Sequence, residues 1–159
     1  MKRSLLIGLC SFAVFCSAVH IEARGRSAKA LILVAHRGGV VDQERSENSL
    51  KAIEEAIRRG YTHVEVDARC TKDGHVVCFH ERNMKGEAGI DADITNLTLA
   101  EVGKVVLTRS KEHIPTFDEY CARCRGRINL MVDIKGVDDQ WLEQYTLEID
   151  EALRRHGLL

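Results

Sequence analysis

Apolar runs of strand length recur along the chain and are separated by polar turns. Residues 31–35 form a continuous apolar run, and residues 128–134 are almost as apolar, so both predict strands that are covered on both faces. Residues 63–69 alternate between apolar and polar side chains, and a turn at 72–74 leads into a further run at 76–79. The pattern therefore predicts four strands, the middle two of which form a hairpin.

Helix signals fall between and after these strands. Apolar residues share one helix face between the cap, Asn48 or Ser49, and Gly60, and residues 138–156 form an amphipathic helix. Two capping boxes predict two further short helices: Thr98 with Glu101, and Thr116 with Glu119. Because strands alternate with helices, we expect an α/β fold with parallel strands.

The composition is that of one ordinary globular domain. The 159 residues include 23 Lys and Arg against 24 Asp and Glu, which gives a formal charge of −1, and 45% of them are hydrophobic. This balance excludes a polybasic nucleic-acid-binding arm, so no nucleic-acid partner is expected. Any phosphate chemistry must therefore come from a local site.

The first residues have the pattern of an export signal. A basic start precedes an apolar run over residues 5–19, with small side chains at Ala18 and Ala23 as cleavage sites. We expect a signal peptide over residues 1–23, a domain over 24–159, and export to the periplasm or the extracellular space. The run has about 15 residues where a spanning helix needs about 20, so no stable membrane span is expected. An uncleaved anchor is the alternative.

Four cysteines lie in the expected domain: Cys70, Cys78, Cys121 and Cys124. An even number is compatible with disulfides in an oxidising compartment, although the spacing does not define a pairing. Cys121 and Cys124 form a CxxC motif, but no second pair of ligands follows at the spacing of a zinc finger. We interpret Cys70 and Cys78, at apolar strand positions, as small buried residues.

Carboxylates gather where the predicted strands end. Glu65, Asp67 and Arg69 point to one face of an alternating strand, and Asp133 lies near the end of the last strand. Taken by itself, the alternating strand at 63–69 would be explained as a sheet face exposed to solvent. Ionisable residues at the carboxyl ends of several parallel strands, however, meet at the rim where α/β barrels hold their active sites. Three acids there need a cation between them, and an all-oxygen set suits Mg²⁺ or Ca²⁺.

Two histidines follow strands directly. His36 and His80 stand where a group that titrates near neutral pH can exchange a proton with a substrate. Arg37 supplies paired donors for phosphate oxygens. Gly38 and Gly39 allow close backbone approach, although a plain turn explains them equally well. Two histidines on opposite sides of one phosphorus atom suggest cleavage of a phosphodiester.

The motifs and their order extend this interpretation. They are His36-Arg37-Gly38, Glu47-Asn48, Glu65-Val66-Asp67, Thr71-Lys72-Asp73-Gly74, His80, Ile114-Pro115-Thr116 and Asp133-Ile134-Lys135. Together they resemble the amino-terminal signature of the glycerophosphodiester phosphodiesterases, over about residues 31–136. The resemblance implies a TIM-type (β/α) barrel of the PLC-like phosphodiesterase type, of which this chain would hold about four of eight units.

The resemblance also implies an activity and a role for each site residue. The reaction would be hydrolysis of glycerophosphodiesters, such as glycerophosphocholine, to glycerol phosphate and an alcohol. His36 and His80 would be the acid–base pair, and Arg37 and Lys135 would bind the substrate phosphate. A divalent cation, Ca²⁺ or Mg²⁺, would be held by Glu65, Asp67 and Asp133. Glu47 would ligate or support the same site.

The chain departs from the family pattern in four residues and in length. Asp133 replaces a Glu, Glu81 replaces an Asp, Ser46 replaces a Pro and Ser49 replaces a Thr. Asp133 has roughly 1.5 Å less reach, so it acts through water or favours the larger ion. A full barrel takes about 250 residues, whereas the expected mature chain has about 140. Half a barrel leaves open sheet edges, through which copies of the chain could associate.

Two other functions stay open. The chain could be an inactive remnant that binds at most a phosphoester or a partner chain. It could also be a related phospholipase D-like enzyme that acts on sphingo- or lysophospholipids. That enzyme would need an exposed apolar docking loop, whereas residues 85–96 are polar.

Overall fold

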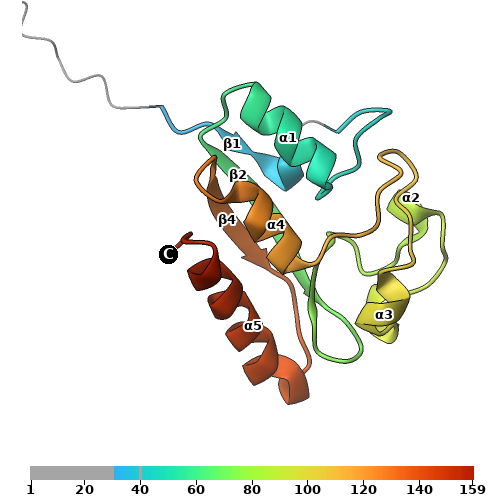
Figure 1. Ribbon diagram of the computed structural model, residues 1–159. Helices are drawn as coiled ribbons and strands as arrows, with labels where there is room; N and C mark the ends of the chain where they lie inside the picture. The colour runs from blue at the N-terminus through green and yellow to red at the C-terminus, as the bar shows by residue number, and fades with distance from the viewer. Residues whose placement is uncertain (1–30, 40) are drawn as a thin grey trace, which may run out of the picture. The chain divides into compact units, whose positions relative to one another are not determined.

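The centre of the fold is strand β2 (His63–Cys70), which pairs with three other strands. The computed structural model describes residues 31–39 and 41–159, so the expected signal peptide at 1–23 lies outside the described residues (Figure 1). β1 (Val34–Ala35) and β4 (Asn129–Ile134) flank β2 and run parallel to it, while β3 (Val76–Cys78) returns antiparallel. The predicted parallel pairing and the hairpin are both confirmed.

Helices follow the parallel strands, as expected for an α/β fold. They are α1 (Leu50–Arg58), α2 (Lys85–Ala88), α3 (Leu99–Val102), α4 (Phe117–Cys124) and α5 (Leu142–Arg155), with 3₁₀ turns η1 (His36–Gly38), η2 (Ile94–Asn96) and η3 (Asp139–Trp141). Both capping boxes form, at Thr98 and Thr116. The last helix begins at Leu142, later than predicted, because the residues before it form the turn η3. Among residues 31–39 and 41–159, no helix is long and apolar enough to cross a membrane.

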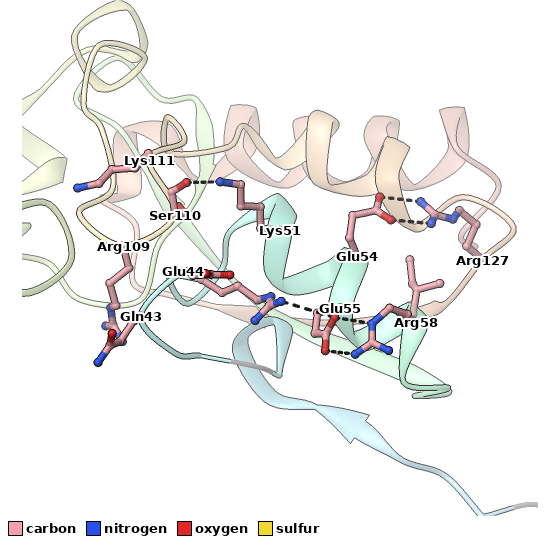
Figure 2. A pocket seen from close by; sticks show the side chains of 12 residues that line it. Gln43, Glu44, Lys51, Glu54, Glu55, Arg58, Arg109, Ser110, Lys111 and Arg127 are labelled. Carbon is pink, nitrogen blue, oxygen red and sulfur yellow. Dashed lines mark hydrogen bonds and ion pairs between the residues drawn. The ribbon is translucent and has the colours of Figure 1, made fainter.

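The main core lies between β2 and helices α1, α4 and α5. Val64, Val66 and Ala68, at alternate positions of β2, are fully buried there, as the alternation predicts. Helix α1 is also tied to the segment after α4, because the Glu54 carboxylate accepts hydrogen bonds from Arg127 at 2.9 and 2.8 Å, beside a surface groove of about 600 Å³ (Figure 2). One face of the sheet is thus covered by helices.

The cysteines of the described residues are buried free thiols in this core: Cys70, Cys78, Cys121 and Cys124. Burial raises the pKa of Cys70 to about 11 and the pKa values of Cys121 and Cys124 to about 12. The interpretation of Cys70 and Cys78 as small buried residues is therefore confirmed.

Two predicted strands are less buried than their sequence pattern indicated. Only Val34 and Ala35 of the first apolar run pair as a strand, and Leu31 is 73% exposed. In β4, Met131 is 47% and Ile134 is 58% exposed. The prediction that both strands are covered on both faces is wrong. Within the described chain, β1 and β4 pair only with β2, and the helices pack against the opposite face of the sheet.

The polar stretch after His80 folds around its few apolar residues. Met84 and Ile94 are fully buried in a second cluster, which also contains Val102 of α3 and the partly buried Ala88 of α2. Val77 and Phe79 pack into the same cluster. Because Phe79 directly precedes His80 and Val77 lies three residues before it, the second cluster helps to fix where His80 lies.

Candidate active site

His36 and Arg37 lie at the carboxyl end of β1, in a turn with unusual backbone geometry. Arg37 has φ +54°, in the left-handed region that few non-glycine residues adopt. Gly38 follows with φ +87°, and a Cβ atom there would lie 2.7 Å from Cβ of Ala52. The backbone of Gly38 therefore packs too close to Ala52 for any side chain to fit. A turn alone would not require glycine for this reason. Strained residues of this kind persist where the surrounding packing enforces them, commonly at functional sites.

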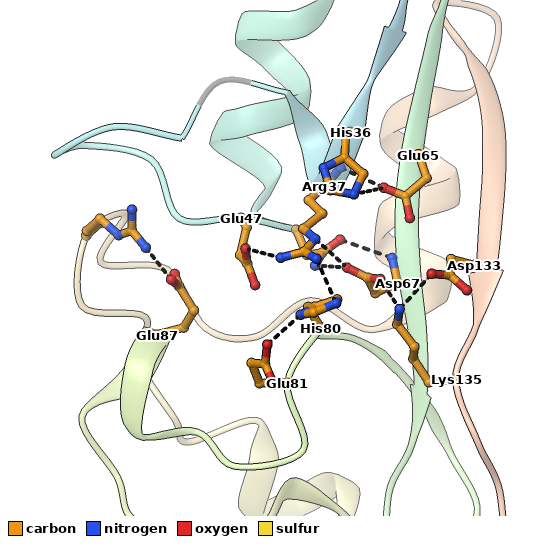
Figure 3. Close-up of polar contacts among 12 residues, drawn as sticks. His36, Arg37, Glu47, Glu65, Asp67, His80, Glu81, Glu87, Asp133 and Lys135 are labelled. Carbon is orange, nitrogen blue, oxygen red and sulfur yellow. Dashed lines mark hydrogen bonds and ion pairs between the residues drawn. The ribbon is translucent and has the colours of Figure 1, made fainter.

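Three carboxylates from two adjacent strands form the centre of the site. Glu65, Asp67 and Asp133 each offer an oxygen atom, and these atoms all lie within 4.8 Å of one another (Figure 3). Asp67 and Asp133 are partners in the β2–β4 register. The backbone N–H of Arg37 donates to Glu65 at 2.7 Å, which ties the β1 turn to the cluster. The structure thus brings the three acids together, as the strand-end pattern predicts.

Lys135 places its ammonium group among these carboxylates. The Nζ atom lies 2.8 Å from Oδ1 of Asp67 and 2.6 Å from Oδ2 of Asp133. Burial acts to lower the pKa of Lys135, but the hydrogen bonds and charges of Asp133 and Asp67 outweigh it, so the pKa is raised. The hydrogen bond from Lys135 lowers the pKa of Asp133. Lys135 therefore stays positively charged and partly neutralises the acids.

The guanidinium of Arg37 connects the cluster to the other predicted residues. Its Nη1 atom lies 3.1 Å from Oε2 of Glu47, Nη2 lies 2.7 Å from Nε2 of His80, and Nε lies 3.7 Å from Oδ2 of Asp67 (Figure 3). Burial acts to lower the pKa of Arg37, but the Glu47 hydrogen bond and the charges of Glu47, Asp67 and Glu65 raise it overall. Arg37 is a fixed cation at the middle of the site.

The two histidines are held very differently. Nδ1 of His80 lies 2.9 Å from Oε1 of Glu81, and Arg69 donates a hydrogen bond to the backbone carbonyl of His80. His36 has a side chain that is 70% exposed, and its Nε2 atom lies 3.9 Å from Oε2 of Glu65. Both ring nitrogens of His80 thus have partners, Arg37 and Glu81, whereas most of the His36 side chain is exposed to solvent.

The structure brings every predicted site residue into one region at the carboxyl ends of the strands. These residues are His36, Arg37, Glu47, Glu65, Asp67, His80, Asp133 and Lys135. Sequence reasoning missed Asn48, which it offered only as a helix cap. Ser49 caps α1, and the Asn48 side chain instead binds Asp67. Its place directly after Glu47 is the one sequence signal that could have linked it to the site.

The acidic cluster suits a divalent cation. Carboxylate oxygens are the ligands that Ca²⁺ and Mg²⁺ prefer, and two oxygens on opposite sides of one Ca²⁺ ion lie about 4.6–5.2 Å apart. The oxygens of this cluster lie within 4.8 Å of one another. Oδ1 of Asp67 is also buried, and its partner is the ammonium group of Lys135 at 2.8 Å. A divalent cation at this position would be a further partner for the same oxygen atom.

The matches to known proteins agree on one family. The model of the glycerophosphoryl diester phosphodiesterase family matches residues 36–153. The chain belongs to this family. Glycerophosphodiester phosphodiesterase 1 of Mus musculus is 31% identical over 115 residues, which cover 67% of this chain and 34% of that protein. A lysophospholipase D of Mus musculus is 36% identical over 70 residues, which cover 44% of this chain and 21% of that protein.

Solved structures share the fold of this family member. An Oleispira antarctica phosphodiesterase, in complex with the product sn-glycerol-3-phosphate, has a TM-score of 0.66 and 26% identity, over 78% of this chain and 52% of that chain. A glycerophosphodiester phosphodiesterase from Parabacteroides distasonis has a TM-score of 0.68 and 24% identity, over 79% and 52%. The predicted partial barrel is therefore confirmed. The chain spans about a third of the length of the first mouse relative and about half of these solved chains.

Proposed function

We propose that this chain acts in the metal-dependent hydrolysis of glycerophosphodiesters, such as glycerophosphocholine, to glycerol phosphate and an alcohol. The observation that carries the proposal is the convergence of two histidines, two cations and three acids at the ends of adjacent strands. The similarity to the mouse glycerophosphodiester phosphodiesterase and to the Oleispira antarctica enzyme, which binds the product sn-glycerol-3-phosphate, supports the same substrate class.

Arg37 and Lys135 are the groups suited to bind the substrate phosphate. Both lie at the centre of the cluster, and neighbouring carboxylates raise the pKa of each, so both are charged at neutral pH. The planar Arg37 guanidinium can donate two parallel hydrogen bonds to phosphate oxygens. To do so it would give up its contact with His80, which would leave the imidazole free for proton transfer.

His36 and His80 would share the proton transfers. One imidazole removes a proton from the attacking oxygen, and the other protonates the oxygen of the leaving alcohol. The attacking oxygen belongs either to water or to a substrate hydroxyl, and in the second case water opens the cyclic phosphodiester in a later step. His36 comes from the turn after β1 and His80 from the segment after β3, which supports roles on different sides of a bound phosphodiester. A divalent ion held by Glu65, Asp67 and Asp133, when bound, would offset negative charge on the phosphate oxygens.

Lysophospholipase D activity is the second candidate. It is favoured by the 36% identity to a mouse lysophospholipase D. Against it, the segment that would have to dock on lipid is polar and carries exposed charged residues such as Lys85 and Asp91. Product analysis with glycerophosphocholine and lysophosphatidylcholine separates the two activities, because only one substrate keeps an acyl chain.

The test of the proposal is turnover of glycerophosphocholine by the purified chain with Ca²⁺, with Mg²⁺ and with EDTA. We expect turnover that EDTA abolishes and that His36→Ala lowers by about 10²–10⁴-fold. Turnover that persists in EDTA or in His36→Ala would contradict the proposal. A well-folded protein without any turnover would favour the alternative of an inactive remnant, and circular dichroism establishes the folding.

We also propose export of this chain and self-association through its sheet edges. Export rests on the predicted signal at residues 1–23, and amino-terminal sequencing of protein recovered outside the cytosol tests it.

Self-association is supported by exposed apolar residues on β4 and before β1, such as Met131, Ile134 and Leu31. Sedimentation of the purified chain measures it, and a monomer at all concentrations contradicts it.

A further inference from the structure

Asn48 lies between the β1 turn and β2 and contacts both. Its backbone N–H donates to the carbonyl oxygen of Arg37 at 2.8 Å. Its side-chain Nδ2 donates to Oδ2 of Asp67 at 2.8 Å, and its Oδ1 accepts the backbone N–H of Asp67 at 3.1 Å. Asn48 is completely buried and has φ +55°, a conformation that asparagine tolerates better than most residues. One residue thus connects two elements of the site.

Helix capping does not account for these contacts. The cap of α1 is Ser49, whose side chain accepts the backbone N–H of Ala52 at 3.2 Å. The Asn48 side chain makes no hydrogen bond to α1, and both of its polar atoms are hydrogen-bonded to Asp67. Its role must therefore be sought at Asp67.

The contacts divide the two oxygens of Asp67 between different tasks. Oδ2 is held by Asn48 and also lies 3.7 Å from Nε of Arg37, whereas Oδ1 lies 2.8 Å from Nζ of Lys135, which also contacts Asp133. Asp67 is 1% exposed, so water cannot replace a lost donor easily. Because Oδ2 and the backbone N–H of Asp67 are both bound to one amide, rotation of the carboxylate would break a hydrogen bond, and Oδ1 stays beside Lys135.

We propose that Asn48 is a positioning residue that orients Asp67 toward the divalent cation. The inference rests on the proposed metal-dependent function and deepens it. Groups that hydrogen-bond to a metal ligand commonly change metal affinity about 10–100-fold when they are removed. Asn48 acts through Asp67 and touches neither the cation nor the substrate.

The experiment compares Ca²⁺ binding by the full chain and by the Asn48→Gly variant, using titration calorimetry. Glycine accepts the left-handed backbone without strain, so the variant removes the side-chain contacts alone. We expect Ca²⁺ affinity to fall by about 10–100-fold. Ser49→Gly is the matched control, because it removes the neighbouring cap while leaving Asp67 untouched, and glycine is tolerated at helix caps. Its Ca²⁺ affinity should equal that of the unmodified chain.

Asn48→Asp gives a second test if Asn48→Gly fails to fold. Aspartate keeps the shape, the left-handed backbone and the acceptor, but it replaces the donor to Asp67 with a second carboxylate oxygen and adds a negative charge. If charge alone mattered, the added negative charge would strengthen Ca²⁺ binding. Weaker binding would therefore show that the orientation of the Asp67 carboxylate has been lost. Equal or tighter binding would overturn the inference. An unmodified chain that binds neither Ca²⁺ nor Mg²⁺ would instead contradict the proposed metal-dependent function.

A double-mutant cycle with Asp67→Asn asks whether Asn48 acts through Asp67. If it does, Asn48→Gly costs little further Ca²⁺ affinity once Asp67 is replaced. Additive losses would show that Asn48 matters through the general fold, and they would overturn the positioning role. Thermal unfolding without metal, measured for each variant, separates lost stability from lost affinity.

Discussion

The Nη2 atom of Arg37 lies 2.7 Å from the Nε2 atom of His80. A guanidinium group can only donate hydrogen bonds, so Nε2 of His80 must be the acceptor and carries no proton. The remaining ring nitrogen, Nδ1, then carries the proton and donates it to Oε1 of Glu81 at 2.9 Å. Arg37 and Glu81 together select one neutral tautomer of His80, whose Nε2 electron pair is directed at Arg37.

Removal of the Glu81 carboxylate should therefore impair proton transfer. In Glu81→Ala, His80 loses the acceptor that fixes its tautomer and ring orientation. We expect kcat to fall by about 10-fold or more while KM changes little, because proton transfer by a positioned group contributes about 10²–10⁴-fold in total. Steady-state kinetics on glycerophosphocholine measure both constants. Glu143→Ala, which removes an exposed carboxylate of α5, is the control and should keep the kcat of the unmodified chain.

Loss of Lys135 should make the protein depend on a divalent ion for its stability. In Lys135→Met, Asp67 and Asp133 lose the ammonium group that lies 2.8 and 2.6 Å from their oxygens. A buried acceptor without a partner costs about 1–3 kcal/mol, so the metal-free variant should unfold at lower urea. Saturating Ca²⁺ should restore much of this loss. Urea unfolding with Ca²⁺ and with EDTA measures it, and Lys72→Met removes an exposed lysine as the control. Equal stability of the two variants in EDTA would contradict the prediction.

Local patterns predicted the parts of the fold that local interactions determine. Thr98 and Thr116 cap their helices as the sequence indicates, because each capping box is complete within four residues. The alternation of β2 also predicted which of its residues face the helices, since a pleated strand directs neighbours to opposite faces. The burial of β4 was not predictable in this way. An apolar strand such as 129–134 has the same pattern whether or not another layer covers it.

The candidate site was predicted to the extent that its residues follow strands. Glu65, Asp67 and Asp133 could be placed together because parallel strands end at one edge. The role of Asn48 depends on a turn of Arg37 that has a left-handed backbone and on a partner 19 residues away. Neither the backbone geometry of Arg37 nor the pairing of Asn48 with Asp67 produces a periodic pattern of residues in the sequence. Contacts between loops and strands therefore required the structure.

The buried cysteines should be inert in the folded protein. Thiolates are the reactive form of cysteine, and burial raises the pKa of Cys121 and Cys124 to about 12, so both are protonated thiols at pH 8. We expect no modification of Cys70, Cys78, Cys121 or Cys124 by iodoacetamide in the native chain, and rapid modification in guanidinium chloride. Peptide mass spectrometry follows each site separately. Modification of these sites at similar rates in both conditions would contradict their burial.

The ion pairs of Glu54 should make the free energy of unfolding of the chain depend on pH. Hydrogen bonds from Arg127, and then from Arg123, lower the pKa of Glu54 from 4.5 to about 2. Because the pKa is lower in the folded state, this contribution to stability is fully present above pH 4.5 and is lost as the pH falls toward about 2. In Glu54→Gln the free energy of unfolding should be lower at pH 7 and should change less between these two pH values. Glu54 is partly exposed, so 1 M NaCl should shrink the difference between the two proteins. Parallel pH profiles of the two proteins would show that the pairing contributes nothing to folding.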